Sequence, residues 1–350
     1  MEKYETIKKP TWKRLGYTPN ETIEQKEYFS DNISFLNIDQ KGINFGKYDD
    51  TRPTPYRGLG EYYELENTSR LNHSLNLNIT EEIPNMIAIK FDLNKLSDTL
   101  INGININLSK GSKARILLLL ESNDENSHYH NGYVRVNLDD DAELELINLQ
   151  NLNGNSKNFT QTDFVLNNRI KLEYSDLELG GGINAVAAKS RFLGEGSEVL
   201  FVPAYLVDEK RKADFEYSLL FHGKRNKGDI EGRGATKDYG TKIFRGNIYF
   251  YEGCSKSTAS EGEFSILLDS TIKIHSIPAM LCDEDDVLGA HAASVGKVNE
   301  DRLFYLMSRG FSAKEAKKII VESSFRPIFE KIEFDDIKEK MFKEINNRML

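Results

Sequence analysis

The pattern of hydrophobic and polar positions changes twice along this 350-residue chain. Residues 1–85 are polar and rich in turn-forming residues, with no clear period. Residues 86–295 contain short runs in which apolar and polar residues alternate, as in strands with one buried face. Beyond residue 295, apolar residues recur at helical spacing. The sequence therefore predicts an N-terminal region (1–85), a β core (86–295) and a C-terminal helical domain (296–350).

The strand-like runs recur at a loosely regular interval. Their starts are offset by 28, 28, 28, 17, 27 and 21 residues, which lies in or near the range of solenoid repeats. No helical pattern separates the runs, which argues against a sheet of alternating strands and helices. A β-solenoid and a β-sandwich both stay open, and the loose repeat favours the solenoid. The runs begin near Ala114, Ala142, Ile170, Glu198, Phe215, Lys242 and Glu263.

Capping signals predict three helices after the β core. Asn299 is a good N-cap for the first helix, and Gly310 stands where a glycine commonly ends one. Ser312 and Glu315 have the spacing of a capping box at the start of a second helix. Pro327 is expected to kink or end that helix. A third amphipathic helix is predicted by apolar residues at every fourth position: Ile337, Met341, Ile345 and Met349.

The charge balance and the cysteine content narrow the class of protein. The chain carries 46 basic and 55 acidic side chains, a formal net charge of −9, whereas nucleic-acid binding usually requires a basic face. No apolar run approaches the roughly 20 residues that span a bilayer, and no secretory signal is visible. The two cysteines, Cys254 and Cys282, are few for a secreted protein of this size. We expect a cytoplasmic protein that binds neither nucleic acid nor membrane.

Familiar catalytic motifs do not occur in the sequence. Gly296-Lys297 resembles the end of a phosphate-binding loop, but Val298 replaces the required Ser or Thr. Dinucleotide, zinc-protease, Cys-x-x-Cys and nucleophile-elbow motifs are also missing, so we expect no enzyme activity. His128 and His130 flank Tyr129, and two histidines at this spacing share one face of a strand and could bind a metal ion. A solvated turn is the favoured interpretation of this pair.

One long stretch carries a specific resemblance. Within residues 278–325 the informative runs are Pro-Ala-Met-Leu-Cys at 278–282, Asp-Asp-Val at 285–287 and His-Ala-Ala-Ser-Val-Gly at 291–296. They are followed by Phe-Tyr-Leu-Met-Ser-Arg-Gly at 304–310 and Glu-Ala at 315–316. This stretch resembles the C-terminal hallmark of the SufB/SufD family of the SUF iron–sulfur cluster assembly machinery. The resemblance implies a right-handed parallel β-helix followed by an α-helical domain. Trp12-Lys13-Arg14 also looks like the start of SufD-type chains.

Two departures from the family pattern favour the SufD type over the SufB type. SufB-type chains carry a functional cysteine six residues before the strand proline, where this chain has Ile272. They also carry a glutamate directly after the histidine, where this chain has Ala292. The resemblance implies that His291 matches the functional histidine of SufD-type chains. A neutral imidazole is a good iron ligand.

Other candidate residues surround this histidine or follow it. Cys282 is a thiolate candidate for iron–sulfur chemistry, although a buried core cysteine is the favoured interpretation. Asp286 lies in an acidic turn that could contact iron, although a solvated turn is the more common outcome. The resemblance implies that the first tail helix docks the SufC ATPase, whereas its apolar members could instead pack onto the β core. These docking candidates are Phe304, Tyr305, Leu306, Arg309 and Gly310.

The resemblance implies a non-catalytic scaffold subunit that pairs with a SufB-like subunit and docks a SufC-type ABC ATPase. The isolated chain is expected to bind no cofactor tightly, while iron or a transient iron–sulfur cluster would be shared with a partner. One alternative is a homodimeric SufB/SufD-like paralogue that works with the ATPase alone. A second alternative is a β-helix polysaccharide-active enzyme with carboxylates in a groove. Such enzymes are usually secreted, and no signal is visible here.

Overall fold

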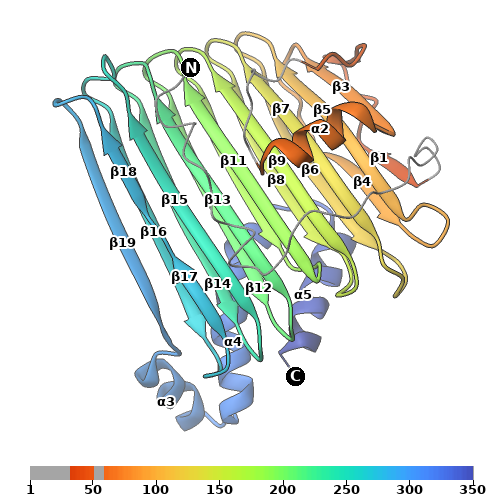
Figure 1. Ribbon diagram of the computed structural model, residues 1–350, viewed down its shortest axis with the longest axis vertical. Helices are drawn as coiled ribbons and strands as arrows, with labels where there is room; N and C mark the ends of the chain where they lie inside the picture. Colours follow the sequence, from red (N-terminus) through yellow and green to blue (C-terminus); the bar gives the residue numbers. More distant parts are fainter. Residues whose placement is uncertain (1–31, 51–58, 350) are drawn as a thin grey trace.

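Two stacked sheets of mostly parallel strands form the body of this computed structural model, which describes residues 32–50 and 59–349 (Figure 1). The first sheet, sheet A, contains in spatial order β1 (Ile33–Leu36), β4 (Ile87–Leu93), β6 (Lys113–Ser122), β8 (Glu143–Asn151), β10 (Lys171–Glu178), β12 (Glu198–Val207), β14 (Lys227–Thr236), β16 (Thr258–Leu267) and β19 (Leu288–Lys297). The second sheet, sheet B, contains β17 (Lys273–Ser276), β15 (Thr241–Phe250), β13 (Lys212–Phe221), β11 (Ile183–Phe192), β9 (Lys157–Leu166), β7 (Tyr129–Leu138), β5 (Thr99–Leu108), β3 (His73–Ile79) and β2 (Ile43–Phe45), while β18 (Ala279–Cys282) also pairs with β15.

The chain alternates between the sheets, so that strands adjacent in one sheet are one full turn apart in sequence. Lys171 of β10, for example, pairs in register with Glu143 of β8 and Glu198 of β12. All named strand pairs are parallel except those of the short strands β1 and β2. Among the described residues, this topology is a parallel β-solenoid. The predicted solenoid is confirmed, and the sandwich alternative is wrong.

A repeated turn fixes where the strands of sheet A begin. A residue with a left-handed backbone stands two positions before each of six consecutive strands, at Gly111, Asp141, Arg169, Gly196, Arg225 and Lys256. Each of these six residues donates its backbone N–H to a carbonyl in the next turn of the solenoid, as Asp141 does to Asn168 at 2.9 Å. The turns therefore form a hydrogen-bonded ladder beside the sheet. Because only two of the six residues are glycine, the position is not evident from sequence.

Three apolar clusters hold the layers together. The largest fills the space between the two sheets. A second cluster lies between the outer face of sheet A and the helices α4 and α5, and a third lies between sheet B and α2. Figure 1 shows α2 on the opposite face of the solenoid from α4 and α5. The helices of the described residues are α2 (Glu61–Ser69), α3 (Glu300–Ser308), α4 (Ala313–Phe329) and α5 (Asp335–Arg348).

The helical tail follows its sequence signals closely. Asn299 caps α3 by accepting the Arg302 N–H, and Ser312 and Glu315 form the predicted capping box of α4. Pro327 lies inside α4, which ends two residues later. The third predicted helix is α5, and its apolar positions are buried against α4 and sheet A. None of the described helices is long and apolar enough to cross a bilayer.

The sequence located some strands and missed others. The predicted starts at Ala114, Ala142, Ile170, Glu198 and Lys242 lie within one residue of observed strand starts, whereas Phe215 and Glu263 lie inside strands. Between residues 86 and 263, strands β4, β5, β7, β9, β11 and β14 have no predicted start. The solvated turn proposed for His128 and His130 is wrong, because both side chains are buried and His130 lies on β7.

The division into segments 1–85, 86–295 and 296–350 stays a prediction. Two strands bear on it, since β3 already belongs to sheet B and β19 ends at Lys297. The segment around Trp12 lies outside the described residues.

Candidate functional site

The last turn of the solenoid ends in an open sheet edge. β19 pairs with β16 on one side, and β17 and β18 pair with β15 in the opposite sheet. Within the described residues, no strand pairs with the other side of β19. An unpaired edge of this kind can accept a strand from another chain.

His291 lies on β19, in register with Glu261 of β16. Its Nδ1 atom is 3.3 Å from Oε2 of Glu261. The imidazole is 35% exposed, whereas the Glu261 side chain is 2% exposed. Burial raises the pKa of the Glu261 carboxyl, and the hydrogen bond from His291 opposes this rise. The site therefore joins an accessible ring at the end of the solenoid to a carboxyl group inside it.

A glycine in the opposite sheet makes room for Glu261. A Cβ atom added to Gly246 of β15 would lie 2.3 Å from Cγ of Glu261, closer than real side chains approach. The Glu261 side chain thus reaches across the interior to the backbone of sheet B. A second close approach occurs one turn later, where a Cβ on Gly289 would lie 2.3 Å from Sδ of Met280.

A second buried carboxylate, Glu263, lies two residues further along the same face. It pairs with Nζ of Lys242, and it accepts hydrogen bonds from the hydroxyl groups of Tyr205, at 2.5 Å, and Ser276. Burial lowers the pKa of Lys242, and the charge of Glu263 acts in the opposite direction. The Lys242 ammonium also lies 5.4 Å from the centre of the Tyr205 ring. The core near the site is therefore polar and internally paired.

The remaining metal candidates are placed near the end of the solenoid but do not form one cluster. Cys282 is an exposed free thiol at the end of β18, and burial together with Asp283 raises its pKa. The interpretation of Cys282 as a buried core cysteine is therefore wrong, because its side chain is exposed. The other cysteine, Cys254, is buried. Asp286 lies in the turn before β19, where its carbonyl accepts the Lys256 N–H at 2.6 Å. Within the described ranges, no three His, Cys, Asp or Glu side chains are grouped as a metal site.

The five predicted docking residues lie on or directly after α3. Phe304 is 74% exposed and Tyr305 is 56% exposed. The guanidinium of Arg309 lies 5.4 Å from the centre of the Tyr305 ring. Leu306 is half-buried, and Gly310 has a φ of 98°, which favours glycine. The packing alternative thus does not account for Phe304 and Tyr305, which leave apolar surface in solvent.

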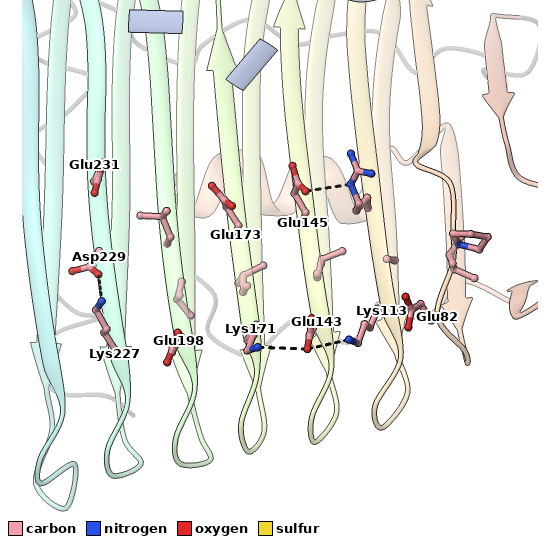
Figure 2. A pocket seen from close by; sticks show the side chains of 18 residues that line it. Glu82, Lys113, Glu143, Glu145, Lys171, Glu173, Glu198, Lys227, Asp229 and Glu231 are labelled. Atoms are coloured by element: carbon pink, nitrogen blue, oxygen red, sulfur yellow. Dashed lines mark hydrogen bonds and ion pairs between the residues drawn. The ribbon is translucent and has the colours of Figure 1, made fainter. Parts of the chain in front are cut away.

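A groove on the outer face of sheet A contains the acidic side chains that an enzyme alternative would need (Figure 2). Glu143 lies 3.4 Å from Lys113 and 3.7 Å from Lys171, measured between charged atoms. Glu145 pairs with Arg115 and Glu173 with Lys331. Each of these three carboxylates is therefore paired with a lysine or arginine side chain, and the row of ion pairs runs across neighbouring strands of sheet A.

Sequence reasoning missed the buried part of the site. Glu261, Glu263 and Lys242 were not singled out, because 55 acidic residues give any single carboxylate little weight. One signal was available. In the run Ala259-Ser260-Glu261-Gly262-Glu263, the glutamates have the same strand parity as the buried Ala259, which places them on its face.

Comparison with known proteins gives a consistent result. Residues 91–324 match the family described as "SUF system FeS cluster assembly, SufBD core domain". The chain is 31% identical over 136 residues to the iron-sulfur cluster assembly protein SufD of Bacillus subtilis, covering 39% of this chain and 31% of that protein. It is 24% identical over 187 residues to a SufBD family protein of Mycobacterium leprae, covering 51% and 47%. It is 27% identical over 202 residues to one from Staphylococcus aureus, covering 57% and 43%. The matched stretches span less than half of each relative.

Proposed function

Because this chain belongs to the SufBD core family of the SUF iron–sulfur cluster assembly system, we propose that it is a non-catalytic, cytoplasmic scaffold subunit of a cluster assembly complex. It pairs with a SufB-like subunit and docks a SufC-type ABC ATPase. The family match over residues 91–324 carries this proposal. The cluster is cargo that is built between subunits, and the isolated chain holds none tightly.

The open end of the solenoid supports pairing with a second subunit. Among the described strands, β19 has a sheet edge without a partner, and His291 lies on β19 with its ring partly in solvent. Within the described residues the metal-binding side chains fall short of a complete site. A partner that adds its own strand at this edge would bring further ligands to His291.

The test is His291→Ala in the complex co-purified anaerobically with the SufB-like subunit and the ATPase. We expect an intact complex with wild-type melting that no longer assembles clusters. The matched control is His275→Ala, since His275 is an exposed histidine on β17 in the same last turn. Wild-type cluster assembly by His291→Ala would contradict the role of this histidine.

The exposed apolar side chains of α3 support the docking of the ATPase. Phe304→Ser and Tyr305→Ser should abolish ATPase capture without lowering stability, since both side chains are mostly in solvent. Leu96→Ser is the matched control, because Leu96 is 95% exposed in a loop far from α3 in sequence. Capture of the ATPase at wild-type strength by the α3 variants would contradict this assignment.

The homodimeric alternative is decided by the same purification. Subunit counting that finds only this chain and the ATPase in an assembly-competent complex would replace the SufB-like partner with a second copy. ATP hydrolysis by the pure chain, or activity on an acidic glycan, would contradict the non-catalytic role.

A further inference from the structure

We propose that Glu261 is a positioning residue for His291: its carboxylate accepts a hydrogen bond from Nδ1–H of the ring, so that the Nε2 lone pair is left for iron or a proton at the subunit interface. This inference rests on the proposed function of His291. It adds a residue that does not itself touch the cargo but determines which ring nitrogen does.

The backbone places the two side chains next to each other. Glu261 and His291 are register partners on the parallel strands β16 and β19, and directly paired side chains on one face of a sheet lie about 4.8 Å apart at the backbone. Their Oε2 and Nδ1 atoms are 3.3 Å apart. The Glu261 side chain is almost completely buried, so water contributes little to holding its carboxyl group. The missing Cβ at Gly246 gives it the space it occupies.

The neighbouring carboxylate shows why Glu261 is directed at the histidine. Glu263 lies on the same face of the same strand and is satisfied by Lys242, Tyr205 and Ser276. Among the described residues, His291 is the side chain in hydrogen-bond contact with Glu261. The buried Lys242 thus pairs with Glu263, and the imidazole of His291 hydrogen-bonds with Glu261.

The chemistry of imidazole turns this contact into a choice of tautomer. A neutral ring carries its proton on one nitrogen and a lone pair on the other, and the hydrogen bond made by one nitrogen decides the state of the second. When Glu261 is ionised, its carboxylate only accepts hydrogen bonds, and the ring proton then stands on Nδ1. Carboxylate–histidine pairs of this kind orient metal-binding histidines in many proteins. A protonated Glu261 would instead donate to Nδ1 and leave the ring proton on Nε2.

The tautomer can be measured on the full-length chain, without any partner. The chain is labelled with ¹⁵N-histidine, and His291→Ala identifies the signal of His291 among the six histidines. We expect long-range ¹H–¹⁵N correlations of the protonated-Nδ1 tautomer in the wild type and loss of that preference in Glu261→Gln, since an amide donates as well as accepts. A protonated Nε2 in the wild type, or an unchanged tautomer in Glu261→Gln, would overturn the proposal.

Glu263→Gln is the matched control. It changes a buried carboxylate of the same type on the same face and strand, and we expect it to lower stability while leaving the His291 tautomer unchanged. In the assembled complex, Glu261→Gln should lower the rate of cluster assembly about 10- to 100-fold, as the loss of such outer partners commonly does, with complex formation intact. If no cluster-assembling complex forms with any variant or the wild type, the proposed function fails, whereas the tautomer measurement still decides the role of Glu261.

Discussion

Lys242 on β15 and Glu263 on β16 form an ion pair that links the two sheets through the interior of the solenoid. Their side chains are 0% and 1% exposed. The pair lies one strand before the open end, next to the Glu261–His291 contact. Two charges removed from water are stable only while each is compensated by the other. The strands β15 and β16 must therefore stay close enough to keep Lys242 and Glu263 in contact.

Removing one partner of the Lys242–Glu263 pair should lower the stability of the protein strongly. Lys242→Met leaves Glu263 with only two hydroxyl donors, and we expect a loss of about 3–5 kcal/mol in the free energy of unfolding, measured in urea. The double variant Lys242→Met/Glu263→Leu should recover part of that loss, since no buried charge is left alone. Lys227→Met is the control, because Lys227 pairs with Asp229 on the outer face while 60% exposed, and should change stability by less than about 1 kcal/mol. Equal effects at the two lysines would contradict the interpretation.

His130 should make stability depend on pH. Its ring is buried between Asn158, at 2.6 Å, and Asn102, at 3.1 Å, and burial lowers its pKa from 6.5 to about 4. Since the folded-state pKa lies below the unfolded one, the unfolded chain takes up the proton first as pH falls. Stability should therefore decrease between about pH 6.5 and pH 4, by up to about 3 kcal/mol from this residue.

The matched variant for this prediction is His130→Gln, which keeps a polar side chain but cannot titrate. Melting temperatures of wild type and variant are compared from pH 7 to pH 4. The wild type should lose more than the variant over this range, and His73, whose pKa is also lowered to about 4 by burial, contributes equally to both proteins. Parallel pH profiles would contradict the prediction.

The end of α5 is held on the solenoid by Arg348. Its guanidinium donates to Asp208 at 2.8 Å from Nε and to the Leu206 carbonyl at 3.0 Å from Nη2. Arg348→Ala should cost about 1–3 kcal/mol, because Asp208 keeps Arg211 as a second partner. Hydrogen exchange should quicken in α5 but not in the strands of sheet B. Lys338→Ala, which removes an α5 contact to Asp335 within the helix, should leave exchange nearly unchanged, and the same response in both variants would refute the anchor.

The ion pairs that line the groove on sheet A should contribute little to the free energy of unfolding. Lys113, Glu143 and Lys171 have side chains that are 43%, 37% and 69% exposed, so water screens their attraction. Glu143→Gln should change the free energy of unfolding by less than about 1 kcal/mol and leave cluster assembly unchanged. A marked fall in cluster assembly would instead identify the groove as a functional surface.

Local signals in the sequence determined the parts of this protein that depend on neighbouring residues. Asn299 and the Ser312–Glu315 box define helix starts within four residues of chain, and they hold in the structure. The alternating runs in sheet A located four strand starts, because one face packs on the interior and its parity is visible. The motif around His291 indicated the family, which the match over residues 91–324 shows.

The tertiary structure alone decided which partners the buried polar residues find. The partners of His130, Asn102 and Asn158, lie one turn away on either side, 28 residues in each direction. Glu261 depends in the same way on His291, 30 residues later, and on a gap above Gly246 in the opposite sheet. A buried polar group is stable only where hydrogen-bonding partners lie within reach of it. In a solenoid those partners lie a full turn away in the chain, so no local pattern reveals them, and only the register between turns brings them together.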